Sequence, residues 1–304
     1  MTPEQQNAAV LLMNTMSWRK ISKHLGLPKS TVSDYLRKVR DGEVVSERDG
    51  PKILFLDVEV QGSVNIAFPR FKANISPDAV LSEPYLLTYA ANWLHEDENQ
   101  ILCEGINDWY IFTEGQPHND IFLVEALYEL LDEADIVIAH NAGFDVGQIN
   151  ARFAYHGIDP PSPYKVICTL QGLRKYFKLP ANSLDASTKY FELERKHKHE
   201  GIKLWVDCYK GDEDAFERMK EYNRGDIPTL RQLYMKIRPF MQNHPNVGLY
   251  YNDDKIRCNT CGSDVMIKQD SKYAYTNLSK FETYRCDNCG SHKRLRKMFG
   301  QKSR

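Results

Sequence analysis

The sequence lacks the features that define membrane, secreted and repetitive proteins. No apolar run approaches the roughly 18 residues that would suggest a membrane span. Residues 1–20 place acidic and amide side chains before a short apolar stretch, which differs from the basic-then-apolar form of a signal peptide. Internal repeats and low-complexity tracts are also missing. We therefore expect a cytoplasmic protein without a membrane partner.

The chain has almost no net charge, but its charges are strongly segregated. The total of −1 combines +2 over residues 1–50, −11 over residues 51–254 and +8 over residues 255–304. Residues 17–40 alone carry +6. Basic ends suit a polyanion and an acidic middle suits cations. Solvated surface charge explains the same values equally well, so charge alone does not decide between binding and a plain surface.

Cysteine is scarce outside one cluster. Of the seven cysteines, Cys103, Cys168 and Cys208 are scattered along the chain. A disulfide framework is not expected in a chain of this size without a secretion signal. The other four form two CxxCG pairs with 24 residues between the pairs: Cys258, Cys261, Cys286 and Cys289. Four thiolates at this spacing predict a closed tetrahedral site for one structural Zn²⁺ ion.

Composition divides the chain into three predicted domains. A chain of 304 residues exceeds the usual size of one domain. Residues 1–41 are predicted to be helical, and the polar stretch DGEVVSERDGP at 41–51 predicts a linker. Residues 52–242 alternate strand and helix patterns, and residues 255–304 hold the paired cysteines and a basic tail.

The middle segment is predicted to have an α/β fold. Strand-like patterns occur at 52–60, 86–94, 101–106, 135–141 and 165–170. Helix-like patterns occur at 121–134, 142–157, 213–223 and 226–241. Three strands followed by helix, strand, helix and strand predict a mixed five-stranded sheet flanked by helices.

Two carboxylates stand at the end of the apolar strand ILFLDVEV. Asp57 and Glu59 lie two residues apart on a strand, so their side chains share a face. The apolar lead-in indicates a central strand, and sites in open α/β sheets form at the carboxyl ends of such strands. Two anions at one place repel and need a cation. Taken alone, a surface-facing pair is the simpler explanation.

Two further acids follow in contexts that also suggest a site. Asp145 lies in HNAGFDVG, just after a predicted strand, and Asp226 lies in EYNRGDIPTL, between two predicted helices. Each has a structural alternative. Asp145 could be a first-turn acid favoured by the helix dipole. Asp226 could be an N-cap with Pro228 inside the first turn.

The motifs DVE, NAGFD and YNRGD, in this order, resemble those of the DEDD superfamily of 3′–5′ exonucleases, which have an RNase H-like fold. Tyr222 lies four residues before Asp226. This spacing is similar to the Tyr subclass, DEDDy, which includes the proofreading domains of family B DNA polymerases. The resemblance covers roughly residues 52–241 and implies a metal-dependent 3′–5′ exonuclease.

The resemblance also implies how two Mg²⁺ or Mn²⁺ ions are held. Asp57, Glu59 and Asp226 would bind the first ion. Asp57 would bridge to the second, which Asp145 reaches directly or through water. Hard cations prefer oxygen ligands, and two of them about 4 Å apart can activate water and stabilise the leaving oxygen. Tyr222 would orient the attacking water.

Two residues of the second motif are candidates for nucleic-acid contacts. Asn141 and Phe144 match the family pattern ahead of Asp145. Phe144 would lie near the terminal base or fill the core, and core packing is the favoured expectation.

Residues 17–40 predict two helices joined by a tight turn at Gly26, with Ser17 as an N-cap. The segment resembles the helix-turn-helix of phage and bacterial DNA-binding proteins, which implies a host cytoplasm if the protein is phage-encoded. Five residues of its second helix would face the major groove of duplex DNA: Lys29, Ser30, Thr31, Ser33 and Arg37. A small protein-binding helical module is the alternative.

The cysteine segment resembles a zinc ribbon. Its basic tail, together with Tyr273, Tyr275, Phe281 and Tyr284, would hold single-stranded nucleic acid by charge and stacking. Docking of replication or repair proteins is the alternative.

These features predict a stand-alone exonuclease with two flanking nucleic-acid-binding modules. We expect DNA rather than RNA as substrate, with a single-stranded 3′ end at the active site. A transposase-like or resolvase-like nuclease is one alternative, although such proteins order their acids differently. A non-catalytic DNA-binding regulator is the other, and the presence of all four carboxylates disfavours it.

Overall fold

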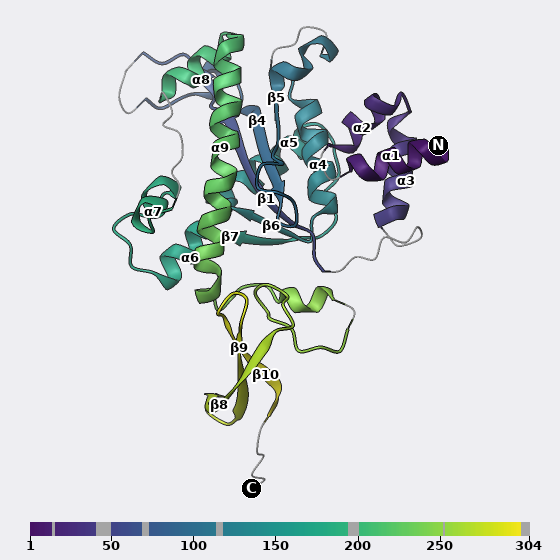
Figure 1. Cartoon of the computed structure of the whole chain (residues 1–304). Coiled ribbons are helices and arrows are strands. Elements are labelled where there is room, and N and C mark those ends of the chain that lie inside the picture. Colours follow the sequence, from purple (N-terminus) through teal and green to yellow (C-terminus); the bar gives the residue numbers. More distant parts are fainter. Residues whose placement is uncertain are drawn as a thin grey trace.

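A computed structural model gives three bodies along the chain, shown in Figure 1. The described residues are 1–13, 16–40, 50–68, 73–113, 118–193, 201–251 and 253–298. Most of the predicted linker, residues 41–49, and the end of the basic tail, residues 299–304, lie outside this part of the chain.

Three short helices form the first body. They are α1 (Pro3–Leu12), α2 (Trp18–Leu25) and α3 (Lys29–Arg40). The predicted turn is confirmed, because Gly26 ends α2 with a left-handed φ of 63°. The Ser17 hydroxyl accepts a hydrogen bond from the Lys20 amide at 3.4 Å, as an N-cap does. Buried Trp18, Ile21 and Leu36 contribute to a separate small core for these helices.

The second body is built on a mixed sheet with the strand order β5-β4-β1-β6-β7. Its strands are β1 (Ile53–Gln61), β4 (Tyr85–Trp93), β5 (Leu102–Gly105), β6 (Ile136–Ala139) and β7 (Lys165–Cys168). Each matches a predicted strand to within two residues. β4 runs antiparallel to β1, whereas β6 and β7 run parallel to it. The predicted α/β class and five-stranded mixed sheet are confirmed.

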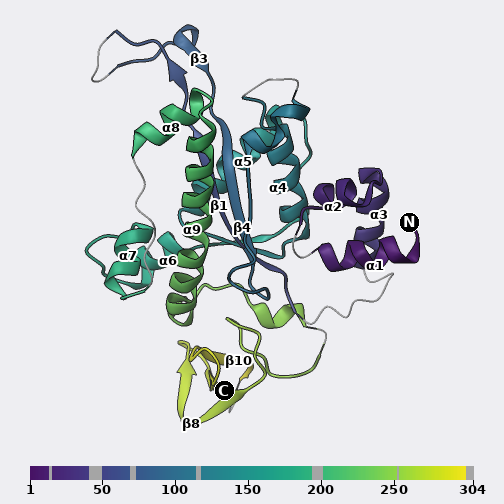
Figure 2. The same ribbon diagram turned by 45° about the horizontal axis from the view of Figure 1, so that its top comes forward.

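Helices cover both faces of this sheet, as Figures 1 and 2 show. One face packs against α4 (Ile121–Glu133) and α5 (Ala142–Tyr155), and the other against the long α9 (Glu213–Ile237). Alternation along β1 explains the two layers. Leu54 and Leu56 belong to the core on the α4 side, and Phe55 belongs to the core on the α9 side.

Three shorter helices connect β7 to α9. They are α6 (Thr169–Tyr176), α7 (Leu184–Tyr190) and α8 (Ile202–Tyr209). Among the described residues there are also four 3₁₀ turns: η1 (Pro77–Ala79), η2 (Ile106–Phe112), η3 (Arg238–Phe240) and η4 (Val247–Tyr250). A small hairpin of β2 (Val64–Asn65) and β3 (Val80–Ser82) extends from the end of β1 and was not predicted from the sequence.

The helix α9 corrects one prediction. The sequence suggested two helices with a break near Asp226, but α9 is continuous and Pro228 lies inside it. Pro228 cannot donate to the carbonyl one turn before it, which normally weakens a helix. Burial compensates, since Ile227 and Leu230 on one side of α9 pack into the sheet core. The alternative reading of Asp226 as an N-cap is therefore wrong.

The third body is a three-stranded antiparallel sheet in the order β10-β9-β8. Its strands are β8 (Met266–Tyr275), β9 (Lys280–Cys286) and β10 (His292–Met298). Figure 1 places it below the central sheet, at the end of α9. In the part of the chain that is described, no helix has both the length and the apolar character needed to cross a bilayer.

Candidate functional site

The three carboxylates of the first and third motifs converge between β1 and α9. Oxygen atoms of Asp57, Glu59 and Asp226 all lie within 4.8 Å of one another. Asp226 is 3% exposed, while Asp57 and Glu59 are half-buried. Three like charges at this spacing repel strongly unless a cation or protons neutralise them. All three donors are carboxylate oxygens, which a hard divalent cation prefers, so their chemistry fits such an ion.

The sheet register explains how β1 delivers its two carboxylates. Glu59 stands opposite Thr88 of β4, and the register then shifts before Val60 pairs with Leu86. A bulge of this kind increases the local twist and re-aims side chains. Before this shift, Asp57 and Glu59 alternate with Leu56 and Val58 along β1, so they share the face of Phe55, on which α9 and Asp226 lie.

Asp145 approaches the same strand from its other side. β6 pairs with β1 only as far as Phe55, and the Val58 amide beyond this point donates to Asp145 Oδ1 at 3.4 Å. Asp145 lies in the first turn of α5, as predicted, and is 3% exposed. Burial raises the pKa of its carboxyl to about 7, although the Val58 amide acts in the opposite direction. A cation bound nearby would favour the ionised carboxylate and so lower this pKa.

Two buried residues that the sequence did not reveal fix the orientation of Asp57. The Asn223 amide nitrogen donates to Asp57 Oδ2 at 2.6 Å. The Thr88 hydroxyl donates to Asn223 Oδ1 at 3.2 Å, which sets the direction of the amide. Both side chains are fully buried. No sequence signal marked this pair, because it joins β4 to α9 across 135 positions of the chain.

Tyr222 lies one turn before Asp226 on α9 and packs against Trp205 of α8. Their ring centroids are 6.5 Å apart in an edge-on arrangement. The Trp205 indole donates to the Val60 carbonyl at 3.1 Å, which ties α8 to the end of β1. Trp205, also unnoticed in the sequence, thereby supports the place of Tyr222 beside the carboxylates.

The second motif places its remaining residues at the surface. Asn141 is exposed and adopts a left-handed conformation with φ of 70° immediately before α5. Phe144 is 47% exposed, so the favoured expectation that it fills the core is wrong. Its ring precedes buried Asp145 in the first turn of α5, where one side of the helix faces the sheet and the adjacent side faces solvent.

The five predicted groove-facing residues of α3 fall into different environments. Ser30 and Arg37 are exposed, and Thr31 and Ser33 are half-buried. The Lys29 ammonium lies 3.4 Å from Glu129 of α4 and so faces the central domain.

The four paired cysteines form one compact cluster. Sulfur–sulfur distances are 3.6 Å for Cys258–Cys289 and for Cys261–Cys286. A tetrahedral zinc site with bonds of about 2.3 Å needs sulfurs about 3.8 Å apart, so the thiols fit Zn²⁺. Hydrogen bonds from neighbouring thiols, first that of Cys261, lower the pKa of Cys258.

The two cysteine turns have the same backbone geometry. The amide of Cys258 donates to Ser263, and that of Cys286 donates to Ser291, each at 2.8 Å. Gly262 and Gly290 both have φ of 77°, a conformation that favours glycine. The glycine after each second cysteine is therefore required by the turn.

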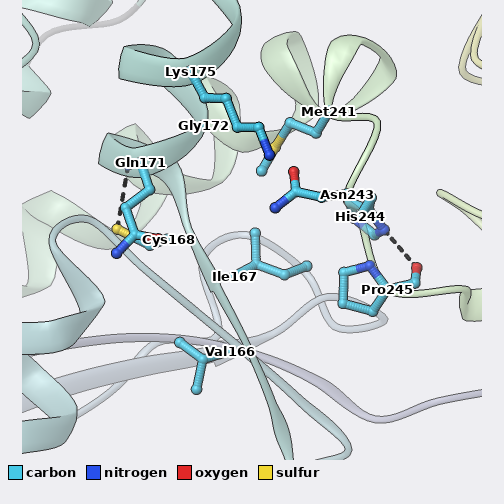
Figure 3. A pocket seen from close by; sticks show the side chains of 10 residues that line it. All are labelled: Val166, Ile167, Cys168, Gln171, Gly172, Lys175, Met241, Asn243, His244 and Pro245. Carbon is cyan, nitrogen blue, oxygen red and sulfur yellow. Dashed lines mark hydrogen bonds between the residues drawn. The ribbon is translucent and has the colours of Figure 1, made fainter.

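A separate hollow of about 180 Å³ lies beside the edge strand β7 and is drawn in Figure 3. Cys168, Lys175, Met241 and His244 are among the residues around it. Among its lining residues in the described part of the chain, none carries a carboxylate. The hollow is therefore distinct from the carboxylate cluster.

Comparisons with known proteins agree with this architecture. Residues 113–203 match the model of the RNase_T family, which is described as an exonuclease. The matched range contains Asn141, Phe144 and Asp145 but not Asp57 or Asp226. None of the curated proteins compared matches the chain.

The mixed five-stranded sheet flanked by helices and the match over residues 113–203 both fit an RNase H-like exonuclease fold. The match supports a nuclease, a hydrolase that uses divalent metal and acts on nucleic acid. The acidic cluster and the four-cysteine cluster supply donor sets for the two kinds of metal.

The buried Asp145 carboxyl predicts a stability that falls as the pH rises without added Mg²⁺ or Mn²⁺. Its pKa in the folded chain, about 7, exceeds the ordinary value of 3.8. Between these values the unfolded chain loses the proton first, so folding becomes less favourable. Asp145→Asn should therefore be more stable than the wild type by roughly 2–4 kcal/mol at pH 8, and about equal at pH 4. Urea unfolding at both pH values, with exposed Asp159→Asn as control, checks this. A difference that does not change with pH contradicts it.

The Thr88–Asn223–Asp57 chain predicts a specific effect on metal binding. Thr88→Val keeps the side-chain shape but removes the donor that orients Asn223. Affinity for Mn²⁺, measured by calorimetry, should fall roughly tenfold, as for other residues that orient metal ligands. Thr88→Ser retains the hydroxyl and should stay within about twofold. Equal affinity in the two variants would show that the hydroxyl does not act through Asp57.

The cysteine cluster predicts one tightly held zinc ion per chain. Cys261→Ser should reduce the zinc content, measured by mass spectrometry of the metal, from about one ion per chain to near zero. Cys208→Ser, which changes a buried cysteine outside the cluster, should keep the ion. A full complement of zinc in the Cys261 variant would rule out four-cysteine coordination.

Proposed function

We propose that the protein is a 3′–5′ exonuclease of the DEDDy type that degrades DNA by a two-metal mechanism. One observation carries the proposal. Asp57, Glu59 and Asp226 come from β1 and α9, yet their oxygens meet within 4.8 Å on a fold that matches an exonuclease family. The chemistry of the donors, all carboxylates, suits Mg²⁺ or Mn²⁺.

Each carboxylate has a distinct part in this proposal. Asp57, Glu59 and Asp226 would hold one ion, and Asp57 together with Asp145 of α5 would hold the second. When bound, two such ions polarise the attacking water and offset the charge on the leaving oxygen. Asn223 keeps Asp57 turned toward the ions through its 2.6 Å hydrogen bond.

In this proposal Tyr222 interacts with the attacking water and Phe144 with the terminal base of the substrate. Tyrosine side chains keep their proton at neutral pH, so Tyr222 orients the attacking water and does not deprotonate it. The Tyr222 ring packs edge-on against Trp205, which supports its orientation. Phe144, with its exposed ring next to Asp145, stacks on the terminal base, and Asn141 contacts the strand beside it. These contacts suit a single-stranded 3′ end.

The flanking bodies would bring nucleic acid to this site. Residues 17–40 bind duplex DNA through their cationic side chains. The ribbon binds single-stranded nucleic acid, for which Tyr275 offers a ring that is 69% exposed. Two other aromatic rings of the ribbon lie under cationic side chains. The Lys280 ammonium is 3.7 Å from the Tyr273 ring centroid, and the Arg294 guanidinium is 4.7 Å from that of Phe281. Such pairs present charge and stacking surface together. Docking of replication or repair proteins is the second role considered for this ribbon.

End-labelled oligonucleotides test the proposed reaction. The purified chain, with Mg²⁺ or Mn²⁺, should shorten 5′-labelled single-stranded DNA progressively and release the label from 3′-labelled DNA at once. Asp57→Ala and Asp226→Ala should each reduce the rate by at least about a thousandfold, since each variant removes a carboxylate from the metal-binding set. Duplex DNA and RNA run in parallel identify the preferred polymer.

Asp185→Ala, at an exposed position of α7, serves as the matched control and should retain full activity. Circular dichroism should show that the Asp57 variant remains folded, because removing one of several repelling carboxylates does not destabilise the metal-free protein. Retained activity in Asp57→Ala, or shortening from the 5′ end, would contradict the proposal.

A further inference from the structure

The helix-turn-helix contacts the nuclease through opposite charges. Its cations come from α2 and the start of α3, and the carboxylates come from β5 and α4. The ion pairs are Arg19–Glu125, Lys20–Glu104 at 2.7 Å and Lys29–Glu129 at 3.4 Å. Figures 1 and 2 both show α2 beside α4. We call Glu104, Glu125 and Glu129 the acidic patch.

Glu129 is bound in the way that a nucleic-acid phosphate is bound. Its carboxylate accepts a hydrogen bond of 3.1 Å from the Arg19 amide in the first turn of α2. The Lys29 ammonium faces it from the start of α3. Phosphate contacts in protein–DNA complexes use the same donors, namely lysine, arginine and backbone amides at helix starts. The Glu129 side chain is only 6% exposed, so it fills this position in the docked state.

Aromatic rings of the nuclease extend the same contact. The Arg19 guanidinium lies 4.0 Å from the Phe122 ring centroid. The Lys23 ammonium lies 3.2 Å from the Phe112 ring and 4.6 Å from the Trp109 ring. Three cationic side chains of α2 therefore contact the nuclease: Arg19, Lys20 and Lys23. A polyanion that needs them must compete with this surface.

The energetics allow such an exchange. Desolvation offsets much of the attraction within a buried ion pair, so the net gain from docking is small. Glu104 and Glu129 are both nearly buried, whereas their partners Lys20 and Lys29 remain more than 40% exposed. An incoming phosphate can therefore approach these half-exposed cations from the solvent side and replace their carboxylate partners. Phosphates offer one negative charge per 1.7 Å of duplex, a much denser charge than three carboxylates.

We propose that this cationic face has two mutually exclusive partners, the acidic patch of the nuclease and the phosphate backbone of duplex nucleic acid. The acidic patch imitates phosphates and lowers the affinity for duplex until the helix-turn-helix is displaced. This inference rests on the proposed duplex binding by residues 17–40. It adds that the docked chain is the low-affinity state and that duplex binding frees α2 from α4.

A closed DNA dumbbell tests the competition, because it is a duplex without a 3′ end for the active site. We would measure its affinity by fluorescence anisotropy for the full chain without added metal. Glu125→Gln/Glu129→Gln should bind about five- to tenfold more tightly than the wild type, since the competing state is weakened. The control Glu83→Gln/Glu213→Gln removes the same charge at exposed positions elsewhere. It should change the affinity less than about twofold.

Two further results complete the test. Adding Lys20→Ala and Lys29→Ala to the patch variant should abolish its gain in affinity. In the wild-type chain, a saturating dumbbell should raise hydrogen exchange over residues 106–112 and 121–133, which the displaced helices no longer cover. Equal affinity of the patch and control variants, or unchanged exchange over these residues, overturns the inference.

Parallel exonuclease assays separate this inference from the proposed function. Normal shortening of 3′ ends without tighter dumbbell binding in the patch variant overturns the competition alone. Tighter binding in a chain that hydrolyses no substrate overturns the exonuclease and supports the competition.

Discussion

The repulsion among Asp57, Glu59 and Asp226 is the constraint on which the rest of the site depends. Their oxygens lie within 4.8 Å of one another, a spacing that is unfavourable without a neutralising cation. The surrounding structure holds them together despite this. β1 is a central strand with neighbours on both sides, and α9 packs into the core with Ile227 and Leu230 next to Asp226. The burial of apolar surface around β1 and α9 thus offsets the electrostatic repulsion and keeps the three carboxylates close together.

The same cluster shows how a fold orients carboxylates through neighbouring residues from other elements. Asn223 holds Asp57, Thr88 holds Asn223, and the Val58 amide holds Asp145. The Thr88–Asn223 and Val58–Asp145 links are buried and the Asn223–Asp57 link is partly buried, so all three are shielded from water to a large extent. Trp205 supports Tyr222 in a similar way. It packs against the Tyr222 ring, and its hydrogen bond to Val60 joins α8 to the end of β1. The carboxylates are therefore supported from β1, β4, α5, α8 and α9 at once.

Charge also organises the molecule on a larger scale. The sequence segregates basic ends from an acidic middle, and the structure brings part of the basic N-terminal segment onto acids of the middle. Lys29, expected to face DNA, instead lies 3.4 Å from Glu129. A charge pattern that suits a polyanion is thus partly satisfied within the chain. The zinc-type cluster differs, because its four thiols come from two local turns of the same geometry and need no other body of the protein.

The sequence by itself determined the elements and the donors. Alternating and helical apolar periods located all five strands of the central sheet and the helices α4 and α5, because those periods follow from backbone geometry. The paired cysteines and the four acids were also identifiable, because metal chemistry restricts the residue types that serve it. Only the tertiary structure decided which residues far apart in the sequence are in contact and which side chains are exposed. It made α9 continuous through Pro228, exposed Phe144, placed Asn223 against Asp57, and set Lys29 against Glu129. Such outcomes depend on packing between distant segments, and local sequence patterns carry no information about those contacts.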